Sequence, residues 1–162
     1  MSSLILIDSY DVVKTPSYIQ KLVKETGHNP VLEIDNKEDY KNMLLLAMVK
    51  PPFIPGFMQD VLVENMKDKR ALNNKILEDS ESDGNLTSIL PKLKSPSLVI
   101  WGAEDKVLHV DNADGFCSEL NDCKKVVIEK TGHIPMVEKP KMAALYLTER
   151  PQHNSSSDSL IC

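Results

Sequence analysis

Three short runs of apolar residues constrain the fold of this 162-residue chain more than any other feature. They span residues 4–7, 97–101 and 126–128, and none of them alternates with polar side chains. Such continuous runs are typical of strands that are buried on both faces of a sheet. Between the second and third runs, apolar side chains recur at helical spacing over 113–120. Strands and helices in this order predict right-handed βαβ units, and hence an α/β fold with a parallel sheet.

The middle of the chain, residues 15–82, has a helical rather than a strand-like pattern. We expect four helices there: one opened at Thr15 and Pro16 and closed by Gly27, a second from 35–38 to Pro51, a third from Pro55, and a fourth over 71–77. Residues 79–84 are polar and predict a return linker, Asp111 is expected to cap the helix that follows the second strand, and Pro140 to open the last helix.

These patterns predict two structural units. Residues 1–14 and 83–150 form part of an α/β core, and the helices of 15–82 form a cap inserted between its first two strands. The Ser-rich segment 151–162 is expected to be a disordered tail.

Composition excludes several function classes. The formal net charge of −5 argues against a nucleic-acid partner. Cys117, Cys123 and Cys162 show no C-x-x-C spacing, so we expect no metal site and no disulfide framework, with Cys117 as a small core residue. No apolar stretch approaches the roughly 20 residues of a spanning helix, and no pattern predicts a cofactor.

Asp105 and His133 are the candidate catalytic residues. Each lies a few residues after a predicted strand, on neighbouring loops at the carboxyl edge of the sheet, where ligands bind in parallel α/β folds. There a carboxylate can orient an imidazole, which can then act as a general base. Glu104 competes for the acid role; His109 is expected near the site, and His28 and His153 on the surface. Taken singly, each motif is more often an ordinary loop; their paired placement favours catalysis.

Two segments carry a family resemblance. Residues 99–108 (VIWGAEDKVL) and 131–140 (TGHIPMVEKP) are similar to the acid and histidine motifs of α/β-hydrolases, and 97–149 resembles the C-terminal third of that fold. The resemblance implies that Asp105 is the triad acid and His133 the base. Segments 51–55 and 71–77 resemble the lid of a lipase branch that includes membrane-anchored monoacylglycerol lipases.

That branch implies a serine esterase or lipase that takes a monoacylglycerol or another small acyl ester. Phe53, Ile54, Phe57 and Met58 are the candidate apolar mouth for the acyl chain, although such residues more often hold helices together. The resemblance implies a cytoplasmic or membrane-associated protein, and it allows membrane association only for a full-length form, since these residues contain no anchor.

The family nucleophile sits on a Gly-x-Ser-x-Gly elbow, and this motif does not occur in the sequence. We therefore expect a fragment of a serine hydrolase that supplies the acid and the base and is inactive alone. Two alternatives stay open at this point. One is a non-catalytic binding protein derived from a hydrolase, and the other is a fragment of an epoxide or haloalkane hydrolase.

Overall fold

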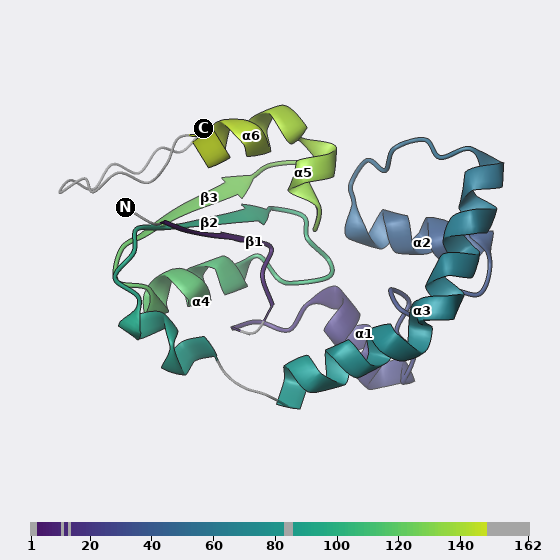
Figure 1. Cartoon of the computed structure of the whole chain (residues 1–162), viewed down its shortest axis with the longest axis horizontal. Helices are drawn as coiled ribbons and strands as arrows, with labels where there is room; N and C mark the ends of the chain where they lie inside the picture. The colour runs from purple at the N-terminus through teal and green to yellow at the C-terminus, as the bar shows by residue number, and fades with distance from the viewer. Residues whose placement is uncertain (1–2, 11, 13, 83–85, 149–162) are drawn as a thin grey trace.

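Three parallel strands organise the computed structural model, which describes residues 3–10, 12, 14–82 and 86–148 (Figure 1). They are β1 (Leu4–Ile7), β2 (Ser97–Gly102) and β3 (Cys123–Ile128), in the order β1-β2-β3. The register aligns Leu4 with Ser97 and Ser97 with Cys123. The predicted parallel α/β fold is confirmed. The predicted tail over 151–162 lies outside the described residues.

The central strand β2 is buried along its whole length, because helices cover both faces of the sheet. On one face Val99 and Trp101 pack with Phe116 of α4 (Asp111–Glu119). On the other, Leu98 and Ile100 form a cluster against which α6 (Pro140–Thr148) packs. Figure 1 shows α4 and α6 on opposite sides of the strands. The sheet therefore provides a rigid platform for the loops at its carboxyl edge.

Three helices, rather than the predicted four, lie between β1 and β2 in the described part of the chain. They are α1 (Tyr18–Thr26), α2 (Lys37–Ala47) and α3 (Gly56–Ser82). Local signals set the ends of the first two. Ser17 and Gln20 form a capping box at the start of α1, Gly27 closes it with φ of 71°, and Asn36 caps α2. The division of the chain into a core and a cap stays a prediction.

The third and fourth predicted helices are one helix, and the predicted linker over 79–84 is wrong at its start because α3 continues to Ser82. The physical reason is that residues 57–82 contain neither glycine nor proline, so nothing interrupts the backbone hydrogen bonds. Ion pairs on the exposed face, such as Lys75 with Asp79 at 2.7 Å, suit a solvated helix. The inner face of α3 packs Val63 against Ile34 and Tyr40.

Helix α4 begins differently from the sequence prediction. Val110 is the N-cap residue and makes no side-chain cap, and Asp111 is already helical. The Asp111 carboxylate instead accepts a hydrogen bond of 2.8 Å from the Thr15 hydroxyl, and the neighbouring Asn112 accepts one from the Lys14 N–H. These bonds fasten the segment after β1 to α4, a long-range role that local capping rules cannot reveal.

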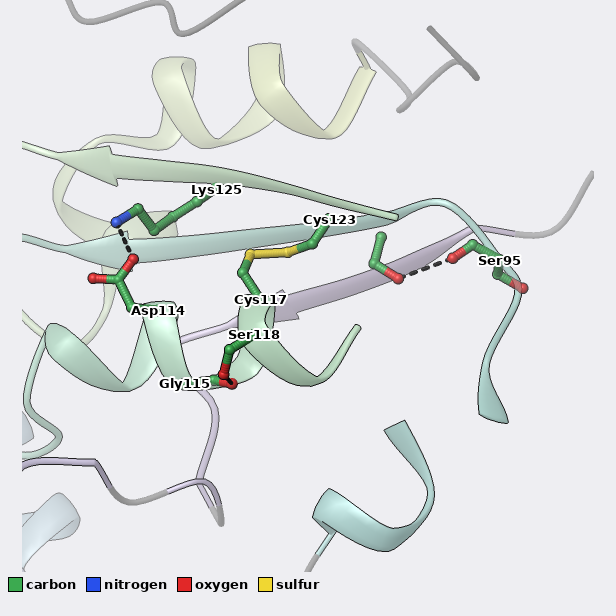
Figure 2. Close-up of a disulfide and its surroundings, with 8 residues drawn as sticks. Ser95, Asp114, Gly115, Cys117, Ser118, Cys123 and Lys125 are labelled. Carbon is green, nitrogen blue, oxygen red and sulfur yellow. Dashed lines mark hydrogen bonds and ion pairs between the residues drawn. A yellow bond between two sulfur atoms is a disulfide. The ribbon is translucent and has the colours of Figure 1, made fainter. Parts of the chain in front are cut away.

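A disulfide joins Cys117 to Cys123, contrary to the expectation of unpaired cysteines. Figure 2 shows it between the last turn of α4 and the first residue of β3, beside the ion pair of Asp114 with Lys125. The two Cα atoms are 5.3 Å apart, and the two cysteines are six positions apart in the sequence. The short connection from α4 to β3 creates this proximity, which C-x-x-C spacing does not encode.

The remaining elements are short. Two 3-10 turns, Leu86–Ser88 and Leu90–Lys92, precede β2, and α5 (Pro135–Glu138) leads into α6. Within the described ranges, no helix combines the length and the apolar character needed to cross a membrane.

Candidate active site

The structure brings Asp105 and His133 together at the carboxyl edge of the sheet. Asp105 lies in the loop after β2, and His133 in the loop between β3 and α5. The imidazole Nδ1 is 2.9 Å from Oδ2 of Asp105, and the carboxylate is fully buried while 28% of the imidazole is exposed. In this geometry the buried carboxylate can orient the imidazole, and the exposed part of the ring is accessible to a substrate.

The loop after β2 fixes the orientation of Asp105. Its Oδ1 accepts hydrogen bonds from the N–H groups of Val107 and Leu108, at 2.8 and 2.9 Å. Oδ2 is then directed at His133. Since a carboxylate only accepts, Nδ1 of His133 must donate, and in the neutral ring Nε2 keeps its lone pair for a proton.

Hydrogen bonds from backbone N–H groups hold the loop that carries His133 in place. The His133 N–H donates to the carbonyl of Ala47 at the end of α2, at 2.7 Å. Glu138 accepts from Gly132 N–H at 2.6 Å and from Lys50 N–H at 2.8 Å, so one carboxylate bridges the loop and the segment after α2. The sequence motif contains Glu138, but only the fold reveals this bridge.

Glycines allow the two loops to approach each other. A Cβ atom on Gly102 would lie 2.0 Å from the carbonyl oxygen of Gly132, and one on Gly132 would lie 2.5 Å from the carbonyl of Ala47. Both neighbours are backbone atoms that cannot move aside alone. The close packing of β2, the histidine loop and α2 therefore depends on these two glycines.

Asp8 is a third ionisable residue at the site, and the sequence analysis missed it. It directly follows β1, is only 6% exposed, and has φ of 41°, an unusual value for a residue with a side chain. Its Oδ1 accepts the N–H of Gly102 at 2.9 Å. The placement after a parallel strand was the available signal, since it is the same signal that selected Asp105.

The three groups influence one another electrostatically. Burial raises the pKa of Asp8 to about 8; the Gly102 hydrogen bond opposes this rise and the charge of Asp105 adds to it. Burial by itself lowers the pKa of His133, but the hydrogen bond to Asp105 and the charges of Asp105 and Asp8 outweigh it and raise the pKa. The imidazolium is therefore stabilised in the folded chain, and this stabilisation is lost as pH rises through the raised pKa.

In the described part of the chain, one group of side chains could offer ligand atoms to a metal ion. It consists of Asp8, Asp105 and His133, and the three ligand atoms lie within 4.8 Å of one another. Hydrogen bonds already engage Nδ1 of His133 and both oxygens of Asp105. The arrangement thus fits a hydrogen-bonded network that can hold protons, in which Asp105 and Nδ1 of His133 already have partners.

The other candidates occupy different environments. The Glu104 side chain is exposed, so Asp105 and not Glu104 faces the imidazole. His109 lies in the loop just before α4, with Nδ1 3.4 Å from a carboxylate oxygen of Asp111. Nδ1 of His28 lies 2.6 Å from a carboxylate oxygen of Glu33, and this pair is not part of the sheet edge. His153 lies outside the described residues.

The four predicted mouth residues do not share one environment. Phe53 is 91% exposed and Phe57 73%, and Met58 is exposed as well, around the start of α3. Ile54 is half-buried and packs against the cluster of Ile34, Tyr40 and Val63. For Ile54 the structure therefore shows a packing role, whereas the side chains of the other three are exposed to solvent.

Comparisons with known proteins agree with the fold. Lipase 3 of Moraxella sp. (strain TA144) is 33% identical over 119 residues, which are 72% of this chain and 38% of that protein. Monoacylglycerol lipase ABHD6 of Homo sapiens is 27% identical over 136 residues, which are 78% of this chain and 40% of that protein. The solved structure of a membrane phospholipase A, a bacterial virulence factor, matches with a TM-score of 0.83 at 31% identity, over 91% of this chain and 47% of that one.

The fold and these similarities thus place the chain among the lipase- and esterase-like α/β-hydrolases. The chain belongs to the α/β-hydrolase superfamily. No protein-family model matches it. The chain spans about two fifths of the length of the curated relatives it matches, in their C-terminal part.

Proposed function

We propose that Asp105 and His133 are the acid and the base of a serine-hydrolase triad that cleaves carboxylic esters of lipids, monoacylglycerols among them. The observation that carries the proposal is the 2.9 Å hydrogen bond between a fully buried carboxylate and a partly exposed imidazole, on neighbouring loops of a parallel sheet. The lipase and monoacylglycerol lipase names of the relatives support the substrate class.

The chemistry assigned to this chain is proton transfer. Nε2 of His133 takes the proton of a serine hydroxyl as that oxygen attacks the ester carbonyl, and then gives it to the departing alcohol. Asp105 stabilises the imidazolium between these two steps. A water molecule repeats the sequence to release the fatty acid. The serine belongs to an elbow that these 162 residues do not contain, so in this proposal the chain alone supplies acid and base and is inactive.

The experiment compares the 162-residue chain with a chimera. In the chimera, this chain follows the part of the Moraxella lipase that precedes the matched region. We expect a fluorophosphonate to label the chimera and leave the 162-residue chain unlabelled, and only the chimera to hydrolyse a monoacylglycerol. Stoichiometric labelling of the 162-residue chain would contradict its inactivity. A chimera that folds but hydrolyses no ester would contradict the triad and favour a non-catalytic binding role.

The exposed surface of Phe53, Phe57 and Met58 is the proposed contact for the acyl chain. Replacing both phenylalanines by serine in the chimera should raise KM for a long-chain monoacylglycerol roughly tenfold or more, since burying one such side chain is worth about 1.5–3 kcal/mol. The KM for an acetyl ester should change little. Leu72→Ser is the control, because Leu72 is 58% exposed further along α3. Equal changes for long and short esters would contradict the assignment.

A further inference from the structure

Asp8 is a buried carboxyl group to which the proposed triad assigns no step. One oxygen of Asp8 lies within 4.8 Å of an oxygen of Asp105 and of a nitrogen of His133. Its Oδ1 accepts from Gly102, whereas Oδ2 is fully buried and has no hydrogen-bond partner in the described structure. The backbone of Asp8 adopts a positive φ of 41° at this point. A buried polar atom without a partner, on a backbone in a rarely populated conformation, indicates a functional constraint.

A proton on Oδ2 resolves this arrangement. Two buried carboxylates in close proximity repel each other, and an unpaired buried charge carries a large desolvation penalty. A protonated Asp8 is uncharged and gains an O–H donor, and Asp105 is the neighbouring acceptor. Asp105 already accepts three hydrogen bonds, from Val107, Leu108 and His133, and a carboxylate has about four acceptor sites. The O–H of Asp8 would occupy the fourth.

We propose that Asp8 is a positioning residue of this site: an uncharged carboxylic acid whose O–H donates a hydrogen bond to the carboxylate of Asp105 and whose other oxygen holds the end of β2 by accepting from the N–H of Gly102. Asp8 thereby orients Asp105, and Asp105 in turn orients His133. The positioning role rests on the proposed function, because it concerns the triad. The shared proton does not, because it is a property of the folded chain whether or not the chain takes part in ester hydrolysis.

The proposal has a consequence for the titration of the site. The pKa of Asp8 is raised to about 8, mainly by burial, and the charged groups that act on it are Asp105, from the loop after β2, and His133, from the loop after β3. Ionised Asp8 in turn raises the pKa of His133. The two groups therefore titrate as a coupled pair. As pH rises past about 8, Asp8 loses its proton and the new charge favours the imidazolium.

The experiment is an NMR titration of the complete 162-residue chain with carbon-13 in the aspartate carboxyl groups and the histidine rings. We expect the Asp8 carboxyl carbon, assigned through backbone correlations, to titrate near pH 8 rather than near its ordinary value of 3.8. We expect the His133 ring carbon to show a second inflection at the same pH. Asp8→Asn, which keeps the shape and can still donate to Asp105, should abolish that inflection. Asp68→Asn on the exposed face of α3 is the control and should leave it unchanged.

Three outcomes would overturn the proposal. The first is an Asp8 carboxyl that titrates in the ordinary aspartate range, a measurement on the wild-type chain that does not depend on whether a variant folds. The second is a His133 titration that is identical in wild type and Asp8→Asn. The third is saturable broadening of the Asp8, Asp105 and His133 signals by Mn²⁺, which would identify an ion site. A shared proton in a chain whose chimera is inactive would leave this inference standing and refute only the triad.

Discussion

Replacing Asp105 by asparagine in the lipase chimera is expected to lower kcat for monoacylglycerol hydrolysis about 10³- to 10⁴-fold. The asparagine amide can accept from Val107 and Leu108 and so keep the loop in place, but its NH₂ group would face Nδ1 of His133. Nδ1 would then have to accept, and the ring would carry its proton on Nε2, where it cannot serve as a base. The KM should change little, because the substrate does not contact the buried carboxylate. Steady-state kinetics on the purified chimera measure both constants.

Glu104→Gln is the matched control for this change. It removes the same charge one residue earlier, from an exposed side chain, and should leave kcat within about twofold of the parent because exposed charges are well screened. Full activity in Asp105→Asn would show that another group orients His133. A large loss in Glu104→Gln would transfer the acid role to Glu104.

Gly102→Ala is expected to lower the free energy of unfolding of the 162-residue chain by at least about 3 kcal/mol. The new methyl group would lie 2.0 Å from the carbonyl oxygen of Gly132 and 2.6 Å from that of Thr131. Both are backbone atoms in the loop that carries His133, so β2 and this loop must separate to accommodate the methyl group. Separation would also weaken the hydrogen bond from Gly102 to Asp8. Urea denaturation followed by the fluorescence of Trp101 measures the change.

Gly56→Ala tests whether the effect is specific to the close approach. Gly56 opens α3, and a methyl group there meets only the Lys37 ammonium, at 4.0 Å. Because alanine favours a helix over glycine by roughly 0.5–1 kcal/mol, this variant should be as stable as the parent or slightly more so. Similar losses in the two variants would refute the proposed tight contact between the loops.

The parallel sheet could be predicted because β1 and most of β2 are apolar, and a run of apolar residues is a local signal. The start of β3 could not, because Lys124 and Lys125 are exposed and hide the strand from a hydrophobicity pattern. Likewise, a polar stretch within α3 resembled a break between helices, although no residue in it interrupts the backbone ladder. Pattern reasoning therefore failed where exposed polar residues lie at the start of β3 and in the middle of α3.

At the site, sequence placed Asp105 and His133 on adjacent loops, because position after a strand determines the edge of a parallel sheet. Their catalytic roles stay predictions. The same logic applied to Asp8 but was not followed, since nothing in the sequence indicates that its side chain is buried. The bridge made by Glu138 and the disulfide of Cys117 depend on contacts between segments, which only the folded chain brings together.

The backbone of His133 is tied directly to a helix that contributes no ionisable group to the site. Its N–H is bonded to the last residue of α2, Ala47, and Glu138 joins the adjacent Gly132 to Lys50 just beyond that helix. A displacement of the C-terminal end of α2 must therefore drag the histidine loop with it or break these bonds. The position of the His133 imidazole is therefore coupled to the position of α2. A ligand that displaces the C-terminal end of α2 would therefore move His133 without contacting it.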